Sequence, residues 1–350
     1  MPTLPATKLR PFVRRIFQAA GAPPDVAKLV AASLVASNLA GHDSHGVVRV
    51  TQYLASIDQG EMDPQARPII LRETAVLATV NGCRGFGQPA AHFAMETALE
   101  KARLHGLAAV ALGHAGHVGR VGEWVQMAAE AGFIGLAWCN GGRPGGIVAP
   151  FGGAERRLGT NPVAAAVPLP GEPPLVMDFA TSVVAEGKVR IARNQGKSIP
   201  EGWILDREGR PSTRPQDLYE GGVLLPAAGH KGYGLSLLVE LLGGVLTGAG
   251  APALPGYAMN NGVFFLVLDP GAFRPREKFD ADARRLVAAI RATRPAPGFQ
   301  EVLLPGEPER RTARRREAQG IPVDQATWQG LLEAAAGLGI RWEEEDGGSE

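Results

Sequence analysis

Residues 41–49 read GHDSHGVVR and concentrate groups that could transfer a proton or bind an anion. A helix that begins near Ser44 and ends at Gly60 would place His45 and Arg49, four residues apart, on one face. The guanidinium could then hold a carboxylate through two hydrogen bonds, while the imidazole exchanges a proton with the neighbouring oxygen. Such a pair could oxidise a 2-hydroxy acid. The spacing alone fits a capping serine, a surface histidine and a salt-bridged arginine equally well.

A metal site is the second interpretation of the histidines. The HxxH pairs His42/His45 and His114/His117 could each offer two imidazoles to a metal. However, they fall at a predicted helix entry and in a glycine loop, and neither an HExxH nor a CxxC motif accompanies them. We therefore expect proton transfer and no bound metal, with a metal-dependent hydrolase or lyase as the alternative.

The composition restricts the partners of the chain. It has 36 basic and 35 acidic side chains and a formal net charge of +1, so no global field would recruit nucleic acid or an anionic membrane. No apolar stretch of about 18 residues and no signal-peptide pattern is present, which argues against insertion or export. Two cysteines, Cys83 and Cys139, are too few for a disulfide framework. We expect a cytoplasmic protein that binds a small molecule.

The hydrophobic pattern predicts a mixed α/β fold. A helical first part is followed by short apolar runs typical of strands, VLATV, AAVAL, FIGLAWC, VAAAVPL, LVMDF and VFFLVL, which alternate with helical stretches. The predicted helices of this region are 89–104, 120–131, 183–194 and 231–247. Charged helices return after Pro305, with Asp324 as a cap. We predict a helical domain from 1–74 plus 308–342 and an α/β cofactor- and substrate-binding body over 75–307.

A dinucleotide fingerprint of the Rossmann type is missing. The stretches GCRGFG, GHAGHVG and GHKGYG lack the spacing or the strand–helix context of GxGxxG. A dinucleotide would therefore have to bind in another way.

Taken in order, the motifs resemble those of the type 2 malate/L-lactate dehydrogenase family. They are GHDSHGVVRVTQYL, GHVGRVGEW, RLGTNP, MDFATSVVAEGKV, GKSIPEGW, GHKGYGLSLLVELL and PGEPE followed by GIPV. The resemblance covers nearly the whole chain. Relatives within this family include ureidoglycolate, sulfolactate and diketogulonate enzymes and Δ1-piperideine-2-carboxylate reductases. It implies NAD or NADP bound by a non-Rossmann fold, a 2-hydroxy or 2-oxo acid of malate or L-lactate type, and a homodimer.

The resemblance also implies site roles. The proton donor of the DSHG motif falls on His45, supported by Ser44, and the substrate-carboxylate ligand falls on Arg49. The ureidoglycolate branch instead places the base on His117. We rank His45 first, since Arg49 shares its predicted helix face, and His117 second, as a base or a nicotinamide-side contact. Thr160 matches a substrate contact.

Further positions match cofactor contacts of the family, and glycine-rich loops with a lysine suit phosphate binding. They are Asn140, Asp178, Phe179, Ala180, His230, Lys231, Pro305, Gly306, Glu307 and Arg311. The rest of the basic run 310–316 is expected to be a solvated helix face.

Lys188 departs from the family pattern. The imine-reducing branch has an aspartate there, which forms a relay with the serine and histidine of DSHG, and a lysine cannot form that relay. Lys188 could instead meet a second negative group, which favours dicarboxylates such as malate. An imino-acid reductase of the same family remains an alternative. A non-catalytic binding protein is a third hypothesis, but the intact GHDSHG, GTNP and HKG motifs argue against it.

Overall fold

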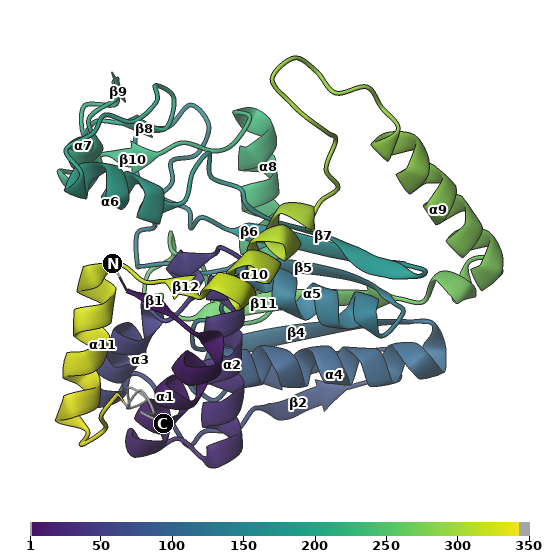
Figure 1. Cartoon of the computed structure of the whole chain (residues 1–350), viewed down its shortest axis with the longest axis horizontal. Coiled ribbons are helices and arrows are strands. Elements are labelled where there is room, and N and C mark those ends of the chain that lie inside the picture. The colour runs from purple at the N-terminus through teal and green to yellow at the C-terminus, as the bar shows by residue number, and fades with distance from the viewer. Residues whose placement is uncertain (1, 343–350) are drawn as a thin grey trace, which may run out of the picture.

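A seven-stranded mixed sheet forms the centre of the computed structural model, which describes residues 2–342 (Figure 1). Its strand order is β2-β3-β4-β11-β5-β6-β7, and only β3 and β4 are parallel neighbours. The strands are β2 Ile69–Glu73, β3 Leu77–Asn81, β4 Leu107–Ala115, β5 Ile134–Asn140, β6 Pro162–Leu169, β7 Glu172–Ala180 and β11 Asn261–Leu268. A doubly wound sheet would be mostly parallel. The predicted mixed α/β, non-Rossmann fold is therefore confirmed.

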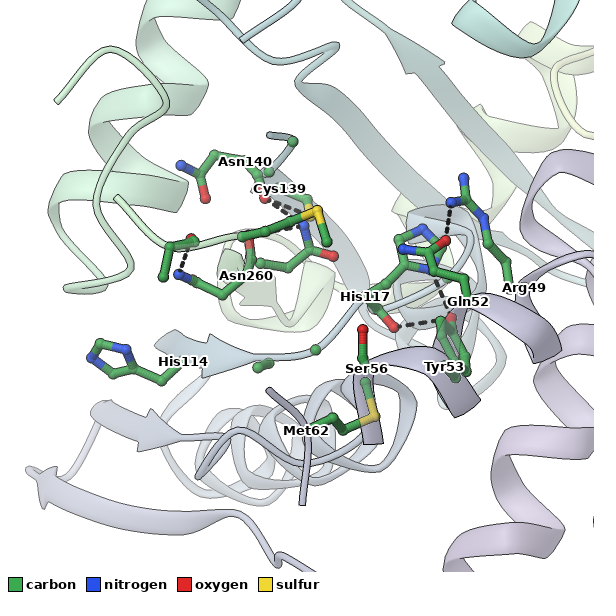
Figure 2. A pocket seen from close by; sticks show the side chains of 18 of the residues that line it. Arg49, Gln52, Tyr53, Ser56, Met62, His114, His117, Cys139, Asn140 and Asn260 are labelled. Carbon is green, nitrogen blue, oxygen red and sulfur yellow. Dashed lines mark hydrogen bonds between the residues drawn. The ribbon is translucent and has the colours of Figure 1, made fainter. Parts of the chain in front are cut away.

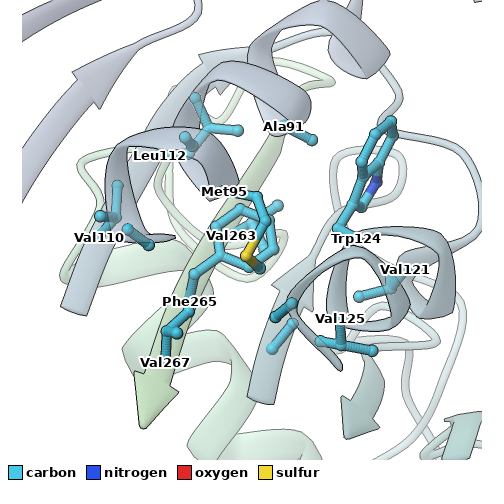
Figure 3. Close-up of a cluster of buried hydrophobic side chains, with 14 of the residues drawn as sticks. Ala91, Met95, Val110, Leu112, Val121, Trp124, Val125, Val263, Phe265 and Val267 are labelled. Carbon is cyan, nitrogen blue, oxygen red and sulfur yellow. The ribbon is translucent and has the colours of Figure 1, made fainter. Parts of the chain in front are cut away.

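The core of this sheet follows from alternation along its strands. Val263, Phe265 and Val267 of β11 are every second residue and are fully buried. Their cluster packs against α4 (Gly87–His105) and α5 (Val121–Glu130), which contribute Met95 and Trp124 (Figure 3). Each such side chain stabilises the fold by about 1.5–3 kcal/mol. This packing fixes the ends of β4, β5 and β11, where the site is built.

The two ends of the chain share a second core. It comprises side chains of α1 (Ala6–Ala19), α2 (Pro24–Leu39), α3 (Arg49–Asp58) and α11 (Gln325–Gly337), and β1 (Thr3–Leu4) pairs with β12 (Ile321–Pro322). The carboxylate of Asp324 accepts a hydrogen bond from the Thr327 N–H at 2.9 Å, which confirms it as the cap of α11. Helix α10 (Glu307–Gln319) packs on α2.

A third, smaller core lies between residues 148 and 224. It includes a sheet of order β10-β8-β9 together with α6 and α7. The elements are α6 Glu186–Asn194, β8 Ile204–Leu205, β9 Pro211–Ser212, α7 Pro215–Tyr219 and β10 Val223–Leu224. The predicted division has one body over 75–307 and places 69–73 in the helical part. In the structure that body contains two hydrophobic cores, and 69–73 is the edge strand β2.

Helix α8 (His230–Val239) continues without a break into a π-helical turn, η2 (Glu240–Val245). The predicted helix 231–247 is therefore confirmed in position, with a wider last turn. The chain then forms β11, the short turn η3 (Pro270–Ala272) and α9 (Arg276–Arg291), which stands at the right of Figure 1. None of the helices within 2–342 combines the length and apolar character needed to cross a membrane.

Candidate active site

A pocket of about 580 Å³ opens where α3 faces the ends of β4, β5 and β11 (Figure 2). This volume is in the range of small-molecule sites. Five predicted site residues line it, namely His45, Arg49, His117, Asn140 and Thr160. The structure thus brings together groups that lie more than 100 residues apart in the sequence.

The backbone of residues 43–49, which positions His45 and Arg49, differs from the predicted helix. The helix predicted from Ser44 to Gly60 is wrong at its start, because 43–45 form a 3₁₀ turn, η1 (Asp43–His45), and α3 begins only at Arg49. Gly46 separates the two with an extended backbone, and a Cβ there would lie 2.2 Å from the Asn38 side chain. The predicted shared helix face therefore does not exist. Arg49 instead folds back, and its Nε donates to the Ser44 carbonyl at 2.7 Å.

His45 is held between a hydroxyl and a second imidazole. The Ser44 Oγ lies 3.1 Å from its Nδ1, and its ring stacks on that of His117 with centroids 5.3 Å apart. Burial, followed by the positive charge of Arg49, lowers the pKa of His45 to about 3. The ring is therefore neutral at pH 7 and able to accept a proton.

His117 has a different partner. The Tyr53 hydroxyl lies 2.7 Å from its Nδ1, and that hydroxyl in turn accepts a hydrogen bond from Gln88 Nε2 at 2.9 Å. Because the Tyr53 oxygen already accepts a hydrogen bond from Gln88, the phenolic O–H can donate to Nδ1 of His117. This network assigns the ring proton of His117 to Nε2. Burial lowers the pKa of His117 well below its ordinary value, and burial raises that of Tyr53 to about 12, so both groups are neutral.

Arg49 places a positive charge beside the two imidazoles of the pocket. Besides Ser44, its terminal nitrogen Nη1 donates to Gln52 Oε1 at 2.6 Å (Figure 2). These two bonds fix the guanidinium plane, and no carboxylate within residues 2–342 forms an ion pair with it. The unpaired guanidinium is suited to binding the carboxylate of a ligand.

In neither HxxH pair do the two imidazoles of that pair converge on one site. His42 faces Glu309 at 3.6 Å, whereas His114 is exposed and points away from His117 (Figure 2). Within 2–342, no group of three or more His, Cys, Asp or Glu side chains is arranged to hold a metal ion.

Other predicted cofactor residues lie along strand β7. Asp178, Phe179 and Ala180 form its last three residues, and none of them lines the pocket. Asp178 Oδ2 accepts a hydrogen bond from the Gly122 N–H at 2.7 Å, near the start of α5, and burial raises the pKa of this carboxyl despite that bond. Phe179 is 41% exposed.

The predicted residues Pro305 and Gly306 lie beside the same strand. The Val176 N–H donates to the Pro305 carbonyl at 3.2 Å, and Gly306, with φ +89°, precedes α10. Glu307 of α10 pairs with Arg291 at 2.7 Å. Arg311 is exposed and engages both oxygens of Glu301. In this structure Glu307 and Arg311 therefore have protein partners.

The remaining predicted residues are exposed. His230 and Lys231 begin α8, and the His230 ring lies 5.9 Å from that of Phe151. Lys188 lies on α6 outside the pocket lining, one residue after Gly187, where a Cβ would contact the Ser44 side chain at 3.7 Å.

Part of the basic run 310–316 is structural rather than solvated. The Arg316 side chain is only 14% exposed, and its two terminal nitrogens bind the two carboxylate oxygens of Asp43 at 2.6 and 3.0 Å. Arg310 donates to the Pro174 carbonyl at 3.0 Å. The expectation of a solvated helix face is therefore wrong for Arg310 and Arg316. Helix α10 binds η1 through the ion pair between Arg316 and Asp43.

Sequence reasoning missed several residues of the site. Tyr53 and Gln52 lie four and three residues after Arg49, so helical spacing could have found them. Gln88 and Asn161 carry no comparable signal. Glu240, a lone acid inside the most apolar helical stretch, was visible in the sequence, but its contacts depend on the fold.

Comparison with known proteins identifies the class to which this fold and pocket belong. The family model described as malate/L-lactate dehydrogenase matches residues 4–332. The chain therefore belongs to the malate/L-lactate dehydrogenase family, an expectation from the motifs that is now confirmed. Relatives in the comparison include hydroxycarboxylate, malate, L-lactate and L-sulfolactate dehydrogenases, and the chain is an oxidoreductase of this kind with a nicotinamide cofactor.

The individual relatives are named for different substrates. The chain is 38% identical to hydroxycarboxylate dehydrogenase B of Escherichia coli (strain K12), over 96% of this chain and 94% of the relative. It is 36% identical to a malate dehydrogenase of Pyrococcus horikoshii, over 96% of each. Among solved structures, a putative malate/lactate dehydrogenase from E. coli has a TM-score of 0.91 at 37% identity, covering 97% of this chain and 96% of that one. Sulfolactate dehydrogenase from Methanocaldococcus jannaschii has a TM-score of 0.88 at 33% identity, covering 97% and 98%.

Proposed function

We propose that this pocket oxidises a 2-hydroxy acid of malate or L-lactate type, and reduces the 2-oxo acid, with His45 as the acid/base group and Arg49 as the carboxylate ligand. The observation that carries the proposal is the unpaired guanidinium of Arg49 in the same pocket as the neutral imidazole of His45. A substrate carboxylate bound to Arg49 would present its adjacent hydroxyl to the imidazoles. Thr160 lines the same pocket as the proposed further substrate contact.

The pocket wall fits the nicotinamide end of NAD or NADP. Asn161 lines this wall, and its Oδ1 is buried without a hydrogen-bond partner within residues 2–342, so an unsatisfied acceptor lies beside the space that we assign to the carboxamide. Asn140 and His117 would flank the ring. We place the rest of the dinucleotide along Asp178–Ala180 and Pro305–Gly306, the edge of β7 beside α10, with Lys231, His230, Glu307 and Arg311 as further contacts. When bound, the cofactor supplies hydride transfer to or from substrate carbon.

The residues of this chain would handle the proton and the carboxylate. In oxidation, His45 accepts the hydroxyl proton, and its partner Ser44 can either donate to or accept from the ring. In reduction, protonated His45 returns the proton to the oxygen. His117 would donate its Nε2 proton as a hydrogen bond to the substrate, because its Nδ1 faces the Tyr53 hydroxyl.

A spectrophotometric screen tests the proposal. Pyruvate, oxaloacetate, other 2-oxo acids and a cyclic imino acid are each mixed with NADH and with NADPH, and oxidation is followed at the nicotinamide absorbance. We expect turnover with at least one malate- or lactate-type acid. Stoichiometric zinc or manganese in the purified protein, with no response to either dinucleotide, would favour the metal-dependent hydrolase or lyase instead. Turnover confined to cyclic imino acids would favour the reductase alternative.

The proposed assembly is a homodimer in a cytoplasm. Six large apolar side chains are exposed along α8 and η2, namely Leu235, Leu237, Leu238, Leu241, Val245 and Leu246, each 38–56% accessible. An apolar surface of this kind supports a protein interface. Cys83 and Cys139 are free thiols, which fits a reducing compartment.

A further inference from the structure

Glu240 is a buried carboxylate in the helical segment that follows α8. It begins the π-helical turn η2 and is 4% exposed, and within 2–342 no Lys, Arg or His forms an ion pair with it. Acids are seldom buried unless their oxygens are satisfied. This carboxylate lies outside the pocket lining and has no role in the chemistry proposed above.

The π-helical turn brings Glu240 close to the pocket wall. The Leu246 N–H donates to the Leu241 carbonyl at 2.8 Å, five residues back, which widens the turn. Gly243 and Gly244 then lie against backbone, since a Cβ on Gly243 would be 2.8 Å from the Asn140 nitrogen and one on Gly244 2.4 Å from the Gly250 carbonyl oxygen. Only glycine allows this approach.

The carboxylate of Glu240 binds two separate segments of the pocket wall. Its Oε1 accepts hydrogen bonds from Asn161 Nδ2 at 2.8 Å and from the Gly159 N–H at 3.1 Å. Its Oε2 accepts one from Asn140 Nδ2 at 3.1 Å. The first two donors flank Thr160, and the third ends β5, so one side chain connects the proposed substrate and cofactor contacts.

These bonds also fix which way two amides face. The Glu240 carboxylate accepts from the Nδ2 groups of both Asn140 and Asn161. The same Nδ2 groups also donate to carbonyls, that of Asn140 to Gly250 at 2.7 Å and that of Asn161 to Ser236 at 3.3 Å. The Oδ1 of Asn140 then accepts from the Gly262 N–H at 3.1 Å, and the Oδ1 of Asn161 has no partner among residues 2–342. The orientation of the Asn161 amide in the pocket wall therefore depends on Glu240 together with Ser236.

The network continues to the imidazole side of the pocket. The Asn140 carbonyl accepts from Asn261 Nδ2 at 2.9 Å, and Asn261 Oδ1 accepts from the Val118 N–H at 2.9 Å. Val118 directly follows His117. Glu240 is thus connected through two asparagines to the segment that carries His117.

We propose that Glu240 is a positioning residue, which sets Asn140 and the Gly159–Asn161 loop so that the nicotinamide cofactor and the 2-oxo acid bind. The proposal rests on the proposed function, because that function supplies the ligands of this wall. Glu240 lies outside the pocket lining, so we assign it no direct contact with either ligand. Its effect is therefore on binding, whereas the proton transfer by His45, which has no contact with Glu240, is largely spared.

Glu240→Gln tests the proposal. The glutamine keeps the volume but presents an N–H₂ group in place of one carboxylate oxygen, so either Asn140 or the Gly159–Asn161 loop loses its hydrogen bond to residue 240. The asparagine amides keep their bonds to Gly250 and Ser236, so the loss concerns the link between the two wall segments. Fluorescence titration with NADH and NADPH should give a dissociation constant for the preferred dinucleotide raised about tenfold or more, as expected for a lost hydrogen bond to a charged group. The KM for the 2-oxo acid should rise similarly, with kcat within about threefold of wild type.

Two controls separate positioning from general destabilisation. Asp217 is another partly buried carboxylate, which accepts from Ser212 Oγ at 2.5 Å away from the pocket, and Asp217→Asn should change neither binding nor KM. In a double-mutant cycle, Glu240→Gln and Asn161→Ala should be non-additive in the dinucleotide dissociation constant, while Glu240→Gln and Asp217→Asn should be additive.

The outcomes are distinguishable. A folded Glu240→Gln variant with dissociation constant and KM within twofold of wild type would overturn the positioning role while leaving the proposed function intact. If that variant does not fold, Glu240→Asp replaces it, since aspartate keeps the charge and loses the reach, and unchanged binding there overturns the proposal equally. Wild-type protein that binds neither dinucleotide would overturn the proposed function, and the positioning role with it.

Discussion

The two stacked imidazoles, His45 and His117, differ in how far protonation of the neutral ring would disrupt their hydrogen bonds. Protonating His117 would place hydrogens on both of its nitrogens, so the Tyr53 hydroxyl would have to turn away, and its other acceptor, the His117 carbonyl, is 3.4 Å distant. His45 faces the Ser44 hydroxyl, which can accept or donate without such a rearrangement. The hydrogen-bond partners therefore favour His45 as the group that gains and loses the proton.

His45→Ala should lower turnover by about 10²-fold or more, the usual contribution of general acid–base catalysis. The measurement is steady-state kcat with the best 2-oxo acid from the screen. Ser44→Ala serves as the matched control and should lose much less, because the imidazole remains. Near-wild-type turnover in His45→Ala would move the acid/base role to His117.

The pH dependence of oxidation should reflect the depressed pKa of His45. Oxidation needs the neutral ring, and a pKa of about 3 keeps it neutral as the pH falls below 6.5, the ordinary value. We therefore expect kcat/KM for the hydroxy acid to show no loss between pH 8 and 5.5 from this group. A decline with a midpoint near pH 6.5 would show instead that the ring titrates normally.

Lys188 offers a test of substrate charge. It is exposed on α6, next to Gly187, which faces the Ser44 side chain. The hypothesis from the sequence is that its ammonium meets the second carboxylate of a dicarboxylate substrate, a group that lactate lacks. Lys188→Ala should lower kcat/KM for malate more than for L-lactate, by roughly threefold to tenfold, in line with a partly solvated ion pair. An equal loss on both acids would contradict the second-carboxylate hypothesis.

At the scale of elements, η1 is shaped by α10 and α2 together. Arg316 of α10 binds both oxygens of Asp43, and Asn38 of α2 donates to the same carboxylate at 2.7 Å while accepting from the Val47 N–H at 2.8 Å. Asp43 immediately precedes Ser44 and His45. The position of the proposed acid/base group is therefore set by a helix more than 260 residues away in the sequence.

Arg316→Met should lower the free energy of unfolding by about 1–2 kcal/mol, because a bidentate, partly buried ion pair is lost and Asp43 keeps only its hydrogen bond from Asn38. Its kcat/KM should fall as η1 becomes less well fixed. Chemical denaturation and steady-state kinetics measure the two effects. Arg314→Met, at an exposed position of the same helix, is the control and should change neither. Equal behaviour of the two variants would show that the pair does not position η1.

The sequence predicted the repeating elements better than the irregular ones. Strands such as β5 and β11 and helices such as α4 follow from local periodicity, and their positions agree with the structure. The break between η1 and α3 was not predictable, because it depends on the Asn38 side chain occupying the space beside Gly46. The same holds for Glu240 and Arg316, whose contacts join segments about 80 and 270 residues apart. Sequence spacing identified His45 and Arg49, but it did so by assuming a shared helix face that the structure does not contain.

At the scale of the whole molecule, the α8–η2 segment has two faces with different tasks. Glu240 points inward to the pocket wall, while the six large apolar side chains of the segment remain exposed. Burying such a surface is favourable at about 25 cal/mol per Å². A second copy of the chain is the partner that we propose, and its binding would also fix His230 and Lys231, which begin α8.

Leu238→Glu combined with Leu241→Glu should convert the dimer to a monomer, because charges would be buried in an apolar interface. Multi-angle light scattering after gel filtration measures the mass, and fluorescence titration should show weaker NADH or NADPH binding in the monomer, since α8 loses its support. Leu71→Glu, at an equally exposed apolar position of the edge strand β2, is the control and should leave the dimer intact. A wild-type monomer at micromolar concentration would contradict the proposed assembly, whereas dissociation by Leu71→Glu alone would place the interface at β2 instead.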